Sequence, residues 1–381
     1  MVCNHSAYST TTGAAPQLFS TALNFFAATQ CFVEDSNYKN KDASNRDTFD
    51  FIIVGGGTAG CVVANRLSEI MRWNVLVLEA GLEPPIESDI PSMENDMYKT
   101  KYDWQYVTKN DGIKHQGLKD GVVQWTRGKM LGGCSSINNM FYVRGQDQDF
   151  QTWYDEDAEL AERVLDSWEH LGMKRVPDIN VAEFKGYGLC AISRANAANG
   201  SRQSTYKTYL KPALRRRNVK VLTNAFVTKI LINDNAQAYG VEVDVNGKQK
   251  IFFANLEVII STGTINTPQL LMLSGIGPEE HLLSKNIPCK VNLPYVGQNL
   301  QDHSYILIPI YTDEPGPEKS SERMFDVIKY LYNKTGYLAH SKVLNLGIFY
   351  SQHKDMNYPE FQYLDQIQLP RKHIFPLSKT M

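Results

Sequence analysis

Short apolar runs alternate with polar and glycine-rich segments along this chain, and their lengths predict an α/β fold. The first run, residues 51–54, reads FIIV and meets three glycines at once, which is typical of a buried strand that ends in a tight turn. Residues 59–68 place apolar side chains on one face, as an amphipathic helix does. A second apolar run at 73–78 (WNVLVL) completes a strand–helix–strand unit.

A different pattern begins at residue 219. Residues 219–233, 240–245 and 249–254 read as strands with turn residues between them, and we expect them to pair in an antiparallel way. Asn246-Gly247 separates the last two, and this dipeptide is a strong signal for a two-residue hairpin turn.

A further strand and a helix are predicted after this hairpin. The apolar run 256–260 is typical of a separate, buried strand. We expect a helix from Pro268 to Ser274, with Thr267 as its cap and Gly275 at its end.

The other segments are less regular. Residues 1–47, rich in Ser, Thr, Asn and Lys, are expected to lie outside a core that begins at Thr48. The segment after Gly81 contains prolines at 84, 85 and 91, which exclude long regular elements. Residues 150–171 have helical spacing, and 344–350 with 360–363 alternate as strands do.

Composition excludes several classes of protein. The 381 residues are 43% hydrophobic and 21% charged, with a net charge of −2, so neither nucleic acid nor an anionic membrane is indicated as a partner. The six cysteines form no C-x-x-C pair. We therefore expect neither a metal site nor a disulfide framework. No uninterrupted stretch of about eighteen apolar residues occurs, so no membrane span is predicted.

The compartment is indicated only by glycosylation triplets. N-x-S/T triplets stand at Asn4, Asn199 and Asn333 and would suit a secreted chain. Residues 18–33 are moderately apolar but lack a basic lead-in, which makes a poor signal peptide. On balance the triplets favour secretion.

The first strand–helix–strand unit carries a candidate nucleotide site. Gly55, Gly57 and Gly60 have the spacing G-x-G-x-x-G between strand and helix. The first glycine permits the turn, the second lets the backbone approach a pyrophosphate, and the third lets the helix pack on the strand. Glu79 ends the second strand, where a carboxylate can accept hydrogen bonds from a ribose. The alternative is a glycine turn in some other α/β protein.

Two later motifs are also candidates for binding. Residues 127–145 (RGKMLGGCSSINNMFYVRG) combine glycines with small hydroxyl residues, and such a loop can lie flat along a planar cofactor. Residues 261–278 (STGTINTPQLLMLSGIGP) repeat the order strand, glycine, helix, with Gly263 at the junction. The first could instead be a glycine-rich surface loop, and the helix of the second could be pure scaffold.

Together these segments resemble the glucose–methanol–choline (GMC) family of flavin oxidoreductases. FIIVGGGTAGCVVANRLSE with VLVLEAG is similar to the family's dinucleotide fingerprint. Residues 127–145 and 261–278 are similar to its two signatures, and VGQNLQDH (residues 296–303) to a further segment. The style most resembles insect members related to glucose dehydrogenase. The resemblance runs from Thr48 to His303, more faintly through Tyr363, and Cys134 stands where a serine is usual.

This resemblance implies a fold and a cofactor. It predicts a Rossmann-like, three-layer FAD-binding domain from residues 48–149 and 205–303, and an incomplete α+β substrate domain from 150–204 and 304–381. The turn would hold the pyrophosphate, Glu79 the ribose, the Val227 backbone the adenine, and the loop after Arg127 the isoalloxazine and ribityl chain. The residues implied for FAD are Gly55, Gly57, Thr58, Ala59, Gly60, Glu79, Arg127, Gly128, Met130, Gly133, Cys134, Asn138, Asn139, Met140, Phe141, Val227 and Gly263.

The implied reaction oxidises the CH–OH group of a small alcohol or sugar to a carbonyl. A base takes the hydroxyl proton, hydride passes to the flavin, and oxygen or a quinone-type acceptor reoxidises it. The family's catalytic histidine lies in a C-terminal block resembling H-W-H-P-x-G-T, which nothing in 304–381 matches. We therefore assign no catalytic residue, and expect a truncated chain that is inactive by itself.

The remaining histidines do not change this expectation. His303 belongs to the NLQDH segment and is interpreted as structural, whereas His340, His353 and His373 have no supporting context. Two other functions stay open, a non-catalytic flavin-binding or interaction protein and an NAD-dependent dehydrogenase. A nicotinamide domain would not need the loop at 127–145.

Overall fold

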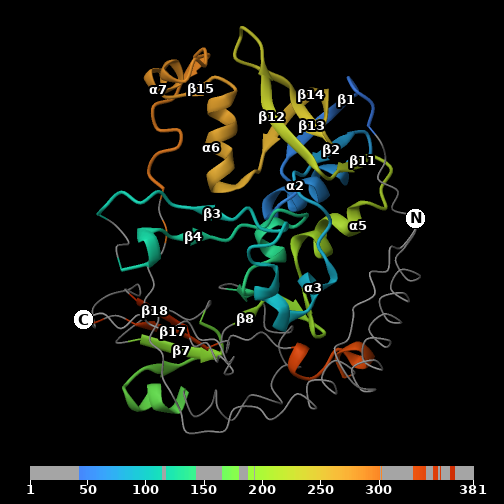
Figure 1. Ribbon diagram of the computed structural model, residues 1–381. Coiled ribbons are helices and arrows are strands. Elements are labelled where there is room, and N and C mark those ends of the chain that lie inside the picture. Colours follow the sequence, from blue (N-terminus) through green and yellow to red (C-terminus); the bar gives the residue numbers. More distant parts are fainter. Residues whose placement is uncertain are drawn as a thin grey trace, which may run out of the picture.

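A six-stranded sheet, with strand order β11-β2-β1-β14-β13-β12, occupies the upper part of the computed structural model as drawn in Figure 1. The structure describes residues 43–113, 117–142, 165–179, 188–192, 194–300, 302, 329–339, 346–350, 352 and 361–364. The sheet has a parallel half and an antiparallel half, which share strand β14.

The parallel half contains β1 (Thr48–Val54), β2 (Val75–Leu78) and β11 (Val219–Leu222). β2 lies between the other two, in register from Val75 to Leu78. All four residues of β2 are buried, as expected for a strand covered on both faces. This confirms the strand–helix–strand unit, whose helix α2 spans Thr58–Ser68.

The antiparallel half is a meander of β12 (Ala225–Ile232), β13 (Ala238–Val245) and β14 (Lys248–Ile260). The hairpin turn at Asn246-Gly247 is confirmed, with φ of 53° and 78°. Residues 219–233 were expected as one strand, and this is wrong. Asn224, with φ of 51°, turns the chain, and its N–H bonds to the Gly81 carbonyl. The run is therefore divided between the two halves of the sheet.

The expectation of two strands at 249–254 and 256–260 is also wrong. β14 is continuous over thirteen residues. It pairs antiparallel with β13 as far as Phe253. It pairs in parallel with β1 from Phe253 to Ile260, with an irregularity in the register between Ala254 and Glu257. Leu256 is 52% exposed, and none of residues 256–260 is fully buried. This run is therefore not the buried strand that its apolar residues suggested.

Three layers result, in agreement with the predicted fold class. One face of the parallel strands packs on α2 through Phe51, Ile53, Val75 and Val77. The opposite face packs on the meander in the larger core cluster, which contains Ile52, Val54, Leu76, Leu78 and Phe252. Successive side chains of β1 and β2 point to opposite faces of the sheet, so each strand contributes residues to both core clusters.

Helix α6 spans Gly263–Leu273 and begins five residues before the predicted start. Pro268 lies inside the helix, and Thr262 precedes its first residue. Thr267 caps nothing. Its Oγ1 lies 3.0 Å from that of Thr262. As the sixth residue of the helix, Pro268 lies past the first turn, where a proline removes one backbone hydrogen bond and is normally unfavourable. α6 is apolar around much of its circumference, yet only Leu270 is buried.

A second, four-stranded sheet has the order β18-β17-β7-β6. It joins β6 (Lys174–Arg175) and β7 (Gly188–Ile192) to β17 (Leu346–Tyr350) and β18 (Phe361–Leu364), which confirms the two late alternating segments as strands. Of the predicted helix at 150–171, residues 165–170 are helical and residue 171 is in a turn, whereas residues 150–164 lie outside the described residues. The proposed domain boundaries stay a prediction.

Short elements connect the two sheets. None between Gly81 and residue 100 exceeds seven residues, as the prolines predicted. Within the described ranges, no helix is long and apolar enough to cross a membrane. The short elements are α3 (Ile86–Asp89), η1 (Pro91–Met97), β3 (Tyr106–Val107), η2 (Lys119–Gly121), β4 (Gln124–Trp125), η3 (Gly133–Ser136), β5 (Phe141–Tyr142), β8 (Arg194–Ala195), β9 (Ala197–Ala198), β10 (Ser201–Arg202), η5 (Tyr206–Leu210), α5 (Lys211–Ala213), β15 (Ile276–Gly277), α7 (Glu279–Ser284), β16 (Val291–Asn292) and η6 (Tyr337–Ala339).

Candidate cofactor site

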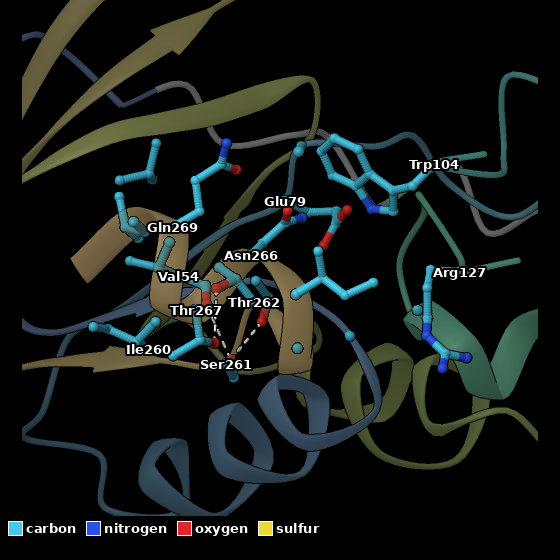
Figure 2. A pocket seen from close by; sticks show the side chains of 18 of the residues that line it. Val54, Glu79, Trp104, Arg127, Ile260, Ser261, Thr262, Asn266, Thr267 and Gln269 are labelled. Carbon is cyan, nitrogen blue, oxygen red and sulfur yellow. Dashed lines mark hydrogen bonds between the residues drawn. The ribbon is translucent and has the colours of Figure 1, made fainter. Parts of the chain in front are cut away.

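A cavity of about 650 Å³ opens at the carboxyl ends of β1, β2 and β14. This is where open α/β sheets bind ligands, and the volume is in the range of cofactor pockets. Figure 2 shows Glu79 between Trp104 and Arg127 on one side and the α6 residues Thr267 and Gln269 on the other. The predicted residues that line it are Gly55, Gly57, Thr58, Ala59, Glu79, Arg127, Gly128, Gly133, Cys134, Val227 and Gly263.

The three fingerprint glycines have distinct surroundings. Gly55 has φ of 98°, and a Cβ there would lie 2.6 Å from the Ser261 carbonyl oxygen. At Gly60 a Cβ would lie only 1.9 Å from the carbonyl oxygen of Gly55, so no side chain fits between helix and strand. Gly57 differs, because its nearest neighbour would be the Gly133 Cα at 3.8 Å. Gly57 therefore leaves its backbone bare on the cavity side.

Helix α2 directs its first turn at the cavity. Gly57 is the residue before the helix, and among the described residues no side chain caps it. Thr58 and Ala59 both line the cavity. Backbone N–H groups in the first turn of a helix lack partners within the helix and carry partial positive charge. This end of α2 therefore fits a phosphate group.

The glycine loop, residues 127–141, packs against this turn backbone to backbone. The Gly132 N–H donates to the Gly56 carbonyl at 2.7 Å. A Cβ at Gly133, whose φ is 51°, would lie 2.8 Å from the Cα of Gly57, and one at Gly128 would lie 2.2 Å from the Gly133 carbonyl oxygen. These contacts bring together two motifs more than seventy residues apart. The loop is therefore a wall of the cavity and not a separate surface loop.

The second signature contacts the same turn from the other side. Ser261 Oγ donates to the carbonyls of Val54 at 3.1 Å and Gly55 at 2.8 Å. Gly263, at the start of α6, has φ of 81°, and a Cβ there would meet nothing within 4 Å. The helix is thus more than scaffold, because its first residues line the cavity.

Glu79 is buried at the centre of the site, with 6% of its surface exposed. One carboxylate oxygen accepts the Gly56 N–H and the other accepts the Gly81 N–H, both at 2.8 Å. Burial raises the pKa of Glu79 to about 7, although the two N–H groups and the charge of Lys129 oppose the rise. Each oxygen keeps capacity to accept a further hydrogen bond, as a ribose would require.

This raised pKa predicts a pH-dependent stability. Between pH 4.5 and 7 the folded chain holds a proton on Glu79 that the unfolded chain has released. The stabilisation is therefore full below pH 4.5 and is lost as pH rises through 7, up to about 3 kcal/mol. Urea unfolding of the cofactor-free protein at pH 5 to 8 measures it. The free-energy difference between wild type and Glu79→Gln should change across this range, and a constant difference would contradict the assignment.

An aromatic group on the β3 segment also lines the cavity. The Trp104 and Tyr106 rings stack at 5.8 Å, and Phe226 lies 6.3 Å from Trp104. Tyr106 Oη donates to Asn266 Oδ1 at 2.6 Å, and this hydrogen bond joins β3 to α6. Sequence reasoning missed these residues. The aromatic alternation in DWQY, residues 103–106, was the available signal.

Asp103 anchors both the aromatic segment and the glycine loop. It is 4% exposed, and its Oδ1 accepts the N–H groups of Gln105 and Arg127, each at 3.0 Å. Its Oδ2 accepts the Lys99 N–H at 2.9 Å. A buried carboxylate with three such partners is fully engaged in shaping the loop. Asp103 is therefore a structural residue of the site.

Six predicted residues do not line the cavity. Gly60 faces the Gly55 carbonyl, and Met130 is fully buried beside Met97 and Ile137. Asn138 Oδ1 accepts a bond from Arg202, and Asn139 Oδ1 accepts one from Tyr98 at 2.8 Å. The other two are Met140, which is buried, and Phe141, which is partly exposed.

No histidine lines the cavity in the part of the chain that the structure describes. The described part of the chain includes His170 and His281, which are in helices and do not line the cavity. His303, His340, His353 and His373 lie outside the described residues. Across the described residues no group of three or more His, Cys, Asp or Glu side chains could hold a metal ion. Cys61, in α2, is buried, which raises its thiol pKa to about 12.

The sequence of this chain matches one protein family and curated relatives within it. A family model described as GMC oxidoreductase matches residues 49–172 and 155–305. Ecdysone oxidase of Bombyx mori is 37% identical over 376 residues, covering 86% of this chain and 55% of the relative. Glucose dehydrogenase [FAD, quinone] of Drosophila melanogaster is 32% identical, covering 80% and 56%. The chain thus spans little more than half the length of these two relatives.

A solved structure shows the same fold. The crystal structure of a formate oxidase matches 81% of this chain and 62% of its own, with a TM-score of 0.67 and 27% identity. The sequence matches and the structural match point to the same family as the geometry of the glycine turn and the glycine loop does. The chain therefore belongs to the GMC family of FAD-dependent oxidoreductases.

Proposed function

We propose that this chain binds FAD in the cavity and is the cofactor-binding part of an oxidoreductase that acts on the CH–OH group of a small alcohol or sugar. The observation that carries the proposal is the backbone contact between Gly57 and Gly133 beside the uncapped end of α2. A wall without side chains lets a dinucleotide lie against the main chain.

Each part of the site has a role in holding FAD. The Thr58 and Ala59 N–H groups would hold the pyrophosphate, and Glu79 the adenosine ribose. Val227, which lines the cavity from β12, would contact the adenine through its backbone. Gly128 and Cys134 would face the flavin and its ribityl chain. When bound, FAD supplies a ring that accepts hydride, and the protein positions the reactants.

For the substrate and the electron acceptor we propose only a chemical class. Two relatives are named for ecdysone and for glucose with FAD and quinone, which supports a hydroxyl-bearing donor and oxygen or a quinone-type acceptor. Asn199 and Asn333, at the two described glycosylation triplets, are both exposed, which supports a secreted protein. The sequence-based alternatives, NAD and a non-catalytic binding protein, become outcomes of the test.

Titration of the cofactor-free chain with FAD tests the proposal. We expect saturable, stoichiometric binding that quenches flavin fluorescence and leaves flavin absorbance bands on the protein after gel filtration. NAD⁺ at the same concentrations should not compete. Displacement of FAD by NAD⁺ would favour the dehydrogenase alternative, and no binding of either would leave an interaction protein.

A further inference from the structure

Arg202 is a fully buried arginine beside the glycine loop. Its Nε donates to the Ser88 carbonyl at 2.7 Å. Its Nη1 donates to both the carbonyl and the Oδ1 of Asn138, each at 2.7 Å, and to the Ser135 carbonyl at 3.3 Å. One guanidinium therefore holds the loop at two positions and joins it to α3.

The segment that carries Arg202 follows the loop along its length. The Asn196 N–H donates to the Met140 carbonyl at 2.7 Å, and β8 pairs with β5 at Phe141. Thr205, three residues after Arg202, donates its N–H to Ser135 Oγ at 3.0 Å. Arg202 is the one charged side chain in this set of contacts. Because it binds carbonyl oxygens on the side away from the cavity, it determines which way the peptide units of the loop face.

We propose that Arg202 is a positioning residue, whose guanidinium fixes residues 135–138 in the pose that accepts FAD. The proposal rests on the function proposed above. Arg202, Ser135 and Asn138 line no part of the cavity. Arg202 would therefore act through the Asn138 N–H, which donates to the carbonyl of the lining residue Cys134 at 2.9 Å, and not by touching the cofactor. A planar fork that bonds several carbonyls suits arginine, and lysine cannot reproduce it.

The surroundings keep this group charged. Burial lowers the pKa of Arg202 to about 10, and the negative charge of Glu94 opposes the shift, as do Tyr98 and Asp89. The group is still a cation at neutral pH. Its Nη2 has no hydrogen-bond partner among the described residues. Apolar groups of similar volume often stabilise a fold as well as a buried charge does, so stability alone does not account for an arginine at this position.

Arg216 offers a matched control. Its Nη1 donates to the Asn65 carbonyl at 2.7 Å and to Ser68 Oγ at 2.6 Å. It thus holds backbone at the far end of α2 and contacts no part of the glycine loop. Loss of either arginine removes charge-assisted bonds to backbone, but only Arg202 acts on the candidate flavin wall.

The experiment compares Arg202→Met, Arg202→Lys and Arg216→Met. For each we would measure the FAD dissociation constant, the melting temperature without cofactor, and amide hydrogen exchange of residues 133–141. Arg202→Met should weaken FAD binding about 10- to 100-fold, the equivalent of one charge-assisted hydrogen bond, and speed exchange in 133–141. Arg216→Met should lower the melting temperature without either effect, and Arg202→Lys should fall in between.

Chemical rescue separates positioning from a general loss of stability. Millimolar guanidinium should restore FAD binding to Arg202→Ala but not to Gly57→Ala, whereas urea at the same concentration should restore neither.

Equal FAD affinity in wild type and Arg202→Met, or equal losses of FAD affinity in Arg202→Met and Arg216→Met, would overturn the proposal. If the Met and Ala variants do not fold, unchanged affinity in Arg202→Lys overturns it and a weakened one supports it. Absence of FAD binding by wild type would reject the proposed function instead, and the exchange data would still test the loop.

Discussion

Gly57→Ala is expected to fold normally and to bind FAD about 10- to 100-fold more weakly than wild type. The added methyl would have no protein neighbour nearer than 3.8 Å, and Gly57 has an extended backbone that alanine adopts without strain. The same methyl would project into the space where the pyrophosphate must approach, and overpacking of this kind typically costs about 1–3 kcal/mol.

Substitutions at two other glycines serve as controls for Gly57→Ala. Gly60→Ala places its Cβ 1.9 Å from a carbonyl oxygen and should lower the melting temperature as well as the affinity. Gly117→Ala adds a methyl to open space and should change neither. FAD titration by fluorescence, together with thermal unfolding of each apoprotein, measures both quantities. Full FAD affinity in Gly57→Ala would place the pyrophosphate elsewhere.

The 381-residue chain alone is expected to oxidise no alcohol at an enzyme-like rate. Among the described residues that line the cavity none is a histidine, and removal of a hydroxyl proton by a general base typically contributes about 10²–10⁴-fold. The family resemblance places that base in a C-terminal block that residues 304–381 do not match. Imperfect placement of substrate and ring would cost roughly a further 10²-fold.

Stopped-flow reduction of the flavin complex tests this second expectation. The complex would be mixed anaerobically with glucose and a panel of primary alcohols. We expect no rapid bleaching of the flavin bands with this chain, and rapid bleaching with a version extended by a family C-terminal block. Fast bleaching by the unextended chain would show that a base within residues 1–381 is sufficient, and His303 would be the first residue to substitute.

The local parts of the site could be predicted from the sequence. The fingerprint, its strand and helix, and the hairpin at Asn246-Gly247 all depend on neighbours within a few residues. Steric limits on glycine act at that range: Gly55 and Gly247 both adopt positive φ. Glu79 was also located correctly beside the turn, because the second strand of such a unit must end next to the first.

Boundaries set by tertiary packing could not be predicted in this way. Pro268 looked like a helix start, but the backbone bonds of α6 continue past it on both sides. A break at residue 255 looked natural from composition, whereas β14 is one strand that pairs with β13 up to Phe253 and with β1 from Phe253 onward. Neither outcome has a local signal. The extent of β14 depends on which strands lie alongside it.

The supporting residues were missed for a related reason. Asp103 and Arg202 are polar residues in ordinary segments, and only the folded chain shows them beneath the glycine loop. Their partners are mainly backbone carbonyls and N–H groups, which carry no residue-type signature. Pattern reasoning finds residues that face a ligand more readily than residues that hold those residues in place.

The contact of Gly57 with Gly133, and of Gly133 with Gly128, has an evolutionary consequence. These close approaches lie in series, so a side chain gained at Gly133 or Gly128 would shift the segment beside it. The glycine turn and the glycine loop lie far apart in the gene, yet a substitution in one limits which substitutions the other can accept. We expect drift at these positions to be nearly absent, and any tolerated change at one to require a compensating change at the next.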